Sequence, residues 1–118
     1  MRLGALGAIL AGLAVAAGAF GAHALHGRLD AHSIETFETA VRYQLVHSLA
    51  LVVAYQRATS VPAARHAGYA FAIGILLFSG SLYALALGAP HAVGFVTPVG
   101  GLSFIAGWAL LAASFRAG

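Results

Sequence analysis

The chain has 118 residues, enough for one domain, of which 61% are hydrophobic and only 8% are charged, against roughly 25% charged residues in soluble domains. A soluble fold of this size would leave too much apolar surface in water, so we predict an integral membrane protein whose solvent is the lipid bilayer. The six arginines stand singly in a chain with a net charge of +3 and no lysine, which argues against a nucleic-acid interface, and the absence of cysteine excludes disulfides and thiolate metal sites.

The first predicted element is a membrane-spanning helix over residues 3–22. Thirteen of these 20 residues are glycine or alanine, and in lipid such small residues let helix backbones approach closely. Arg2, the apolar run and Ala22-His23-Ala24 also resemble a signal peptide, but 20 apolar residues are long for a signal and suit a span. We therefore expect a retained helix, with a packing ridge of small residues at every fourth position: Gly4, Ala8, Gly12 and Ala16.

The second predicted element is one continuous helix over about residues 33–55, with its membrane span at about residues 40–56. Only 14 uncharged residues separate Arg42 from Arg57. They supply roughly 21 Å of helix, whereas a crossing takes about 30 Å. The helix must therefore extend outward through Arg42.

The outer part of this second helix is predicted to be an amphipathic lead-in. Asp30 or Ser33 suits its N-cap, and an apolar face recurs at helical spacing at Ile34, Phe37 and Val41. Glu38 and Arg42 are four residues apart in the favourable order, so we predict an interfacial ion pair that holds Arg42 at the membrane edge.

Two further spans complete a predicted four-helix transmembrane bundle, a single all-α domain over residues 1–118. They cover residues 67–87 and 98–115, with a short polar loop at 57–65 and a loop containing Pro90 and His91 at 88–96. Thr97-Pro98 resembles an N-cap followed by proline at the first helical position.

The arginines predict the orientation of the bundle. Four spans bring both termini and the second loop to one side, which carries Arg2, Arg57, Arg65 and Arg116, against Arg28 and Arg42 on the other side. Because cytoplasmic loops are enriched in Lys and Arg, both termini are predicted to be cytoplasmic, in a multi-pass protein of the cell inner membrane.

The polar side chains of the four spans are predicted to collect at one depth in the outer leaflet. On the second helix, Thr36, Thr39, Tyr43 and His47 share about 80° of arc. Together with polar residues of the other spans, they predict an outer-leaflet polar cluster: His23, Tyr43, Gln44, His47, Ser79, Ser81, Tyr83 and Thr97. The cluster is either a set of interhelical hydrogen bonds or a pocket that binds or conducts a small solute, proton or cation.

A metal or haem site is a third interpretation of the histidines. His23 and His26 are three residues apart, and His47 could join them, but the cysteines and the nearby carboxylates of a familiar metal motif are missing. We therefore assign no metal and no cofactor. No enzyme signature is present, so no catalytic residue is predicted, and His26, His32, His66 and His91 are assigned to loops or interfaces.

Several stretches resemble a known family: Gly18–Leu25, Tyr43-Gln44 with His47, Leu77–Leu87 and Phe95–Leu110. They are similar to the YgdD-like family, domain-of-unknown-function family 423, small bacterial inner-membrane proteins with eukaryotic transmembrane relatives. The resemblance implies four transmembrane helices and an inner-membrane location, and it implies no reaction. The family's recurring polar residues correspond here to Pro98 and the outer-leaflet polar cluster.

Two functional hypotheses remain open. The first is a non-enzymatic membrane protein whose outer-leaflet pocket binds or conducts a small solute or ion. The second is an accessory or assembly subunit of a larger membrane complex, favoured by the small-residue surface. In either case we expect a homo-oligomer in the lipid bilayer that binds no nucleic acid. Under the second hypothesis we also expect a membrane-protein partner.

Overall fold

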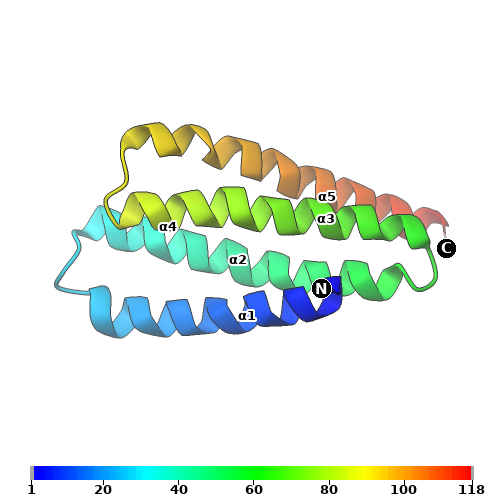
Figure 1. Cartoon of the computed structure of the whole chain (residues 1–118), viewed down its shortest axis with the longest axis horizontal. Helices are drawn as coiled ribbons and strands as arrows, with labels where there is room; N and C mark the ends of the chain where they lie inside the picture. Colours follow the sequence, from blue (N-terminus) through cyan, green and yellow to red (C-terminus); the bar gives the residue numbers. More distant parts are fainter. Residues whose placement is uncertain (1, 118) are drawn as a thin grey trace.

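The computed structural model describes residues 2–117, which form four helical rods joined by short turns (Figure 1). Each rod corresponds to one predicted span, and the third is continuous although its helix type changes twice. In chain order the elements are α1 (Leu3–Phe20), the π-helical turn η1 (Gly21–Leu25), α2 (Ala31–Arg57), η2 (Pro62–Ala64), α3 (Arg65–Gly74), the π-helical turn η3 (Ile75–Ser79), α4 (Gly80–Ala86), η4 (His91–Phe95) and α5 (Thr97–Ala117).

The rods run antiparallel, and each packs chiefly on its neighbours in sequence. The α1 helix lies on α2, α2 lies on α3, η3 and α4, and α5 lies on α3 and η3. The molecule is therefore elongated, 49 × 26 × 22 Å, with α1 and α5 at opposite sides (Figure 1). The predicted all-α membrane bundle is confirmed, while the orientation of its termini stays a prediction.

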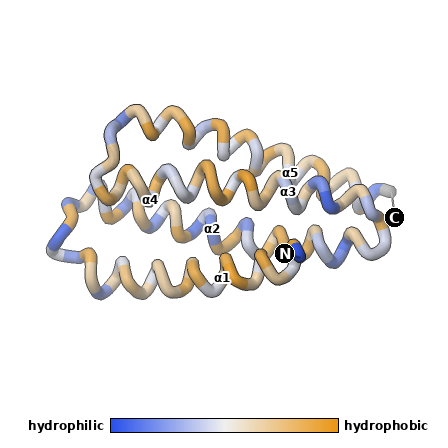
Figure 2. The backbone as a smooth tube through the Cα atoms, in the orientation of Figure 1, coloured by the Kyte–Doolittle hydropathy of each residue, from blue (hydrophilic) through white to orange (hydrophobic). Residues whose placement is uncertain are grey.

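Three of the rods have the length and composition of membrane spans: Leu3–Leu25, Pro62–Ala86 and His91–Arg116. The α2 helix does not meet the same criterion, because polar residues occupy its first half (Figure 2). Its 27 residues extend about 40 Å at about 1.5 Å per residue, and it is packed between its neighbours along their length. We therefore keep the prediction that α2 crosses the bilayer at about residues 40–56.

The lead-in to α2 begins at Asp30. Its carboxylate Oδ1 accepts a hydrogen bond from the backbone N–H of Ser33 at 2.8 Å, so Asp30 is the N-cap and Ser33 lies in the first turn. That N–H bond lowers the pKa of the Asp30 carboxyl below its ordinary value. The apolar face of the lead-in is packed as predicted, with Phe37 buried beside Leu25 and Ala86.

The packing ridge on α1 differs from the prediction. Gly4 contacts the Tyr55 ring, but Ala8, Gly12 and Ala16 are exposed, and a Cβ on Gly12 would meet nothing within 4 Å. The buried small residues lie seven apart instead: Gly7, Ala14 and Gly21.

Helix geometry accounts for this correction. A four-residue repeat drifts by about 40° per step around a helix, so the predicted ridge winds away from α2 within three steps. A seven-residue repeat drifts by only about 20° and stays in contact along the whole helix. The close approach is real at both ends, since a Cβ on Gly7 would meet Val52 at 2.8 Å and one on Gly21 would meet Phe37 at 2.9 Å.

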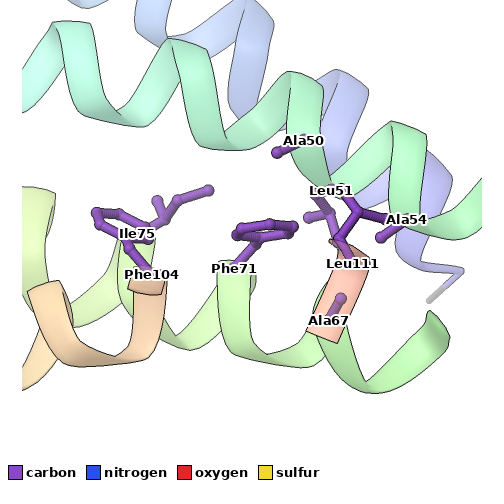
Figure 3. Packing of buried hydrophobic residues seen from close by; sticks show 8 residues of the cluster. All are labelled: Ala50, Leu51, Ala54, Ala67, Phe71, Ile75, Phe104 and Leu111. Atoms are coloured by element: carbon purple, nitrogen blue, oxygen red, sulfur yellow. The ribbon is translucent and has the colours of Figure 1, made fainter. Parts of the chain in front are cut away.

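The α5 helix is fitted to the third rod by phenylalanines that lie against glycines. The ring of Phe104 covers Gly74, and the ring of Phe71 covers Gly107, where an added Cβ would lie 2.6 Å from it. Gly100 meets backbone instead, at Leu77 and Phe78. Both phenylalanines belong to the main core cluster (Figure 3), which comprises Ala50, Leu51, Ala54, Ala67, Phe71, Ile75, Phe104 and Leu111.

Candidate functional site

Gln44 links three helices through its side-chain amide. Its Nε2 donates to the backbone oxygen of Leu10 on α1 at 2.8 Å, and its Oε1 accepts from the Tyr83 hydroxyl on α4 at 2.7 Å. Gln44 itself is buried in α2, with 6% of its surface exposed. The two partners fix the orientation of the amide, because a backbone oxygen can only accept and the phenol here donates.

A groove opens above this amide between α1 and the third rod. Its volume is about 330 Å³, and apolar walls descend to a polar floor at Gln44, Tyr83 and Ser79. The remaining lining residues are Leu6, Leu10, Ala72, Ile75, Leu76 and Gly80. A Cβ on Gly80 would meet nothing within 4 Å, so this glycine leaves the groove open.

The predicted serines and Thr97 bond between helices. Ser79 is 1% exposed, and its hydroxyl donates to the Ala40 backbone oxygen at 2.8 Å. The Ser81 and Thr97 hydroxyls bond to each other between α4 and α5. Thr97 is the first residue of α5 and bonds to Ser81 of the neighbouring helix, whereas the sequence predicted Thr97 to be the N-cap.

His47 lies on the other side of α2 and contacts α5. Its Nε2 is 3.0 Å from the Trp108 Nε1, and its Nδ1 is 2.7 Å from the Tyr43 backbone oxygen. Its ring stacks on Phe104, with centroids 3.6 Å apart and planes 13° from parallel. Only 5% of His47 is exposed.

These contacts define the protonation state of His47. An indole N–H is a donor only, so Nε2 must accept, and a backbone oxygen is an acceptor only, so Nδ1 must carry the proton. His47 is thus the neutral Nδ1–H tautomer. A proton on Nε2 would place two donors against each other and break the Trp108 bond.

A second groove, of about 640 Å³, lies over these rings between α2 and α5. Aromatic side chains dominate its lining, and Tyr43 and Trp108 are 40% and 44% exposed. The lining comprises Tyr43, His47, Phe78, Pro98, Gly101, Leu102, Phe104, Ile105 and Trp108.

The predicted polar cluster is thus divided by α2. Gln44, Tyr83 and Ser79 line the α1 side, Tyr43 and His47 line the α5 side, and His23 is exposed at the end of the first rod. Within residues 2–117 His23 makes no hydrogen bond to any other member of the cluster.

The other predicted charged and histidine positions lie at the surface. Glu38 and Arg42 are both exposed and line a shallow hollow beside α1, with no ion pair between them in the described part of the chain. His26, His32, His66 and His91 are exposed. No group of three His, Asp or Glu side chains among the described residues is arranged to hold a metal ion, and His23 and His26 do not meet His47.

Sequence reasoning missed two features of the site. Trp108 was not proposed as a partner of His47, because an aromatic residue in an apolar span fits a lipid-facing position equally well. Gly80 was not proposed either, because it contributes no functional group and only leaves space in the groove over Gln44. The one available signal for Trp108 was that it is the single tryptophan of the chain.

Comparison with known proteins agrees with the fold. A family model described as a protein of unknown function (DUF423) matches residues 17–101. The chain is 44% identical over 108 residues to the UPF0382 membrane protein SH2409 of Staphylococcus haemolyticus, covering 90% of this chain and 88% of the relative. It is 48% identical over 100 residues to the UPF0382 inner membrane protein YgdD of Escherichia coli, covering 82% and 76% respectively. No solved structure matches the chain.

Proposed function

We propose a function on the premise that this chain belongs to the DUF423 family, a family of unknown function whose relatives above are named as membrane proteins. The resemblance predicted from its motifs is confirmed, and the protein is one of the inner membrane. Our proposal is that it is non-enzymatic and binds a small uncharged solute within the bilayer, in the groove over Gln44, or conducts it along that groove.

The Gln44 amide is the observation that carries this proposal. One Nε2–H bonds to the Leu10 oxygen, while an amide has two such donors, so one donor remains for a solute. The Tyr83 hydroxyl at the same floor is partly exposed and retains a lone pair. Ligand sites typically combine apolar walls with a few well-placed polar groups, which is the composition of this groove.

The lining residues favour an uncharged solute over an ion. None of the nine carries a formal charge, and a charge at membrane depth without a partner is costly. Apolar walls beside one polar floor suit an amphipathic molecule with a small hydrogen-bonding head. Conduction of ions is accordingly the weaker part of the sequence-based hypothesis.

The test uses Gly80, where a larger side chain would fill the groove without displacing a neighbour. Octanoylglycerol binding is measured by native mass spectrometry, and glycerol, urea, potassium and proton flux are measured in proteoliposomes. We expect the wild type to retain octanoylglycerol and Gly80→Leu to lose it. Ala113→Leu, at an exposed site on α5 that lines neither groove, should behave as the wild type does.

Two results would count against the proposal. Equal retention by wild type and Gly80→Leu would remove the groove as the binding site. If the flux of all four probes is no greater than in empty liposomes, the protein does not conduct them, and only the binding part of the proposal stands.

A second candidate is an accessory subunit, and the exposed face of α1 favours it. Ala8, Gly12 and Ala16 present a small-residue surface with no neighbour at Gly12, and such surfaces let another helix approach closely in lipid. The partner is either a second copy of the chain or a different membrane protein. Purification in a mild detergent distinguishes them: a stoichiometric foreign subunit lost in Gly12→Leu supports the accessory role, and a homo-oligomer alone opposes it.

A further inference from the structure

The groove between α2 and α5 is separate from the Gln44 groove and has a different character. It runs from Pro98, at the start of α5, to Trp108, at the middle of that helix. Gly101 leaves its α5 wall low, since a Cβ there would meet only the Phe78 ring at 3.8 Å. A ligand can therefore approach the wall closely at Gly101.

The floor of this groove is held in place by its own contacts. Tyr43, His47 and Phe104 are nearly parallel, with interplanar angles of 9° between Tyr43 and His47 and 13° between His47 and Phe104. The Trp108 indole is fixed by its bond to His47. Tyr43 and Trp108, the exposed rings of this set, are therefore already ordered and lose little entropy when a ligand covers them.

The polar groups within this groove are nearly all engaged. Both nitrogens of His47 and the Trp108 N–H have partners, whereas the Tyr43 hydroxyl, on a residue 40% exposed, makes no hydrogen bond to any residue in the range 2–117. No lining residue carries a formal charge. The groove thus offers the exposed rings of Tyr43 and Trp108 and one donor to a ligand that reaches it through lipid.

We propose that this groove binds the ring of a membrane-soluble quinone. A quinone ring is flat and uncharged, and it stacks on aromatic faces. One of its carbonyl oxygens accepts the hydrogen bond of the Tyr43 hydroxyl, and its isoprenoid tail stays in the bilayer. A lipid acyl chain has neither a flat ring to stack on the aromatic side chains nor a ring carbonyl to accept this hydrogen bond, so it fits the groove less well. The volume of about 640 Å³ lies within the about 300–1,000 Å³ common for small-molecule sites.

The single tryptophan of the chain lies in the groove and reports on its occupancy. Decylubiquinone and a short-chain menaquinone are titrated into the protein in nanodiscs of fixed lipid composition, and Trp108 fluorescence is recorded. We expect saturable quenching in the wild type. Gly101→Leu, which places a side chain in the groove, should weaken the apparent affinity by at least tenfold, and Ile105→Trp, read by competition with a labelled quinone, should do the same.

Two further variants separate the ring contact from the carbonyl contact. Tyr43→Phe keeps the ring and removes the donor, so it should weaken binding roughly fivefold, the loss of one hydrogen bond of about 1 kcal/mol. Ala113→Leu should leave the titration unchanged. All variants are first compared by circular dichroism and size-exclusion chromatography, so that a misfolded protein is recognised.

Three outcomes would overturn the quinone assignment. Linear quenching of equal slope in the wild type and Gly101→Leu would mean that quinone only collides with Trp108 from the lipid. Unchanged affinity in Tyr43→Phe would remove the carbonyl contact. Equal competition by cholestane, a ring lipid without a carbonyl, would assign the groove to ring lipids in general. None of these bears on the Gln44 groove, whose test uses a different variant and probe.

Discussion

At the scale of single residues, His47 and Trp108 determine each other's state. Because the indole can only donate, we predict that His47 is the neutral Nδ1–H tautomer throughout the pH range in which the bond persists. Solid-state NMR of ¹⁵N-histidine-labelled protein in bilayers should show one non-protonated Nε2 among the histidine signals, and it should disappear in His47→Phe. A doubly protonated His47 at neutral pH would contradict the geometry.

The energy of this contact follows from a double-mutant cycle. Trp108→Phe keeps an aromatic ring and leaves the His47 Nε2 without its donor, so we expect a loss of unfolding free energy of about 1 kcal/mol. The combined His47→Phe, Trp108→Phe variant should be less destabilised than the sum of the single variants by about 0.6 kcal/mol, the average for membrane hydrogen bonds. Unfolding in mixed micelles by SDS measures these differences, and strict additivity would indicate no direct bond.

The polar residues were predictable as a set, but their partners were not. Gln44, Ser79 and Tyr83 had to find hydrogen bonds in lipid, so the sequence could predict that they bond between helices. The division of the set by α2 depends on the rotation of each helix about its own axis. The π-helical turn η3 changes that rotation between Gly74 and Gly80, and nothing in the hydropathy of the third span marks it.

At the scale of elements, adjacent glycines on α5 give a matched test of the contact with η3. A Cβ on Gly100 would overlap the backbone nitrogen of Phe78, which cannot rotate away, whereas one on Gly101 would make an ordinary contact at 3.8 Å. We expect Gly100→Ala to destabilise the protein by about 1–3 kcal/mol, the usual effect of overpacking. Gly101→Ala should be close to neutral in the same SDS unfolding measurement. Equal destabilisation by the two substitutions would mean that α5 does not contact η3 through Gly100 as described.

The start of α2 should respond to acid through its N-cap. Because the Ser33 N–H holds the pKa of Asp30 below the ordinary 3.8, the carboxylate stabilises the helix fully above that value. The contribution is lost as the pH falls through the lowered pKa. Amide exchange protection of the first turn of α2 should therefore decline in acid in the wild type. Asp30→Asn, which caps without titrating, should show no such decline.

At the scale of the whole molecule, the fold brings four arginines to one end. Arg2, the turn from Arg57 to Arg65, and Arg116 share that end, opposite Arg28 and the acidic residues. We predict that this end is cytoplasmic. A C-terminal green fluorescent protein should fluoresce and a C-terminal alkaline phosphatase should be inactive. The reverse pattern would invert the orientation and move the polar residues to the inner leaflet.

The overall fold was the most predictable level, for a physical reason. Burial in lipid requires helices of a minimum length, and the four apolar or amphipathic stretches left only one arrangement of spans along the chain. The α2 helix was the exception in composition, and its length was predicted from the two arginines that limit its apolar part. Within the chain, the small residues of α1 that pack on α2 are seven apart rather than four, because four-residue spacing alone does not determine which side of a helix stays in register with its neighbour.

The sequential packing of the four rods also bears on how the chain is assembled. Since each helix contacts mainly the one before it, α1 and α2 can pair as a hairpin while the rest of the chain is still being synthesised. The third rod and α5 can then add in turn, each finding a surface that is already complete. No long loop must close first, so folding should be fast. A substitution that disrupts the contact between α1 and α2 should leave the later helix pairings intact.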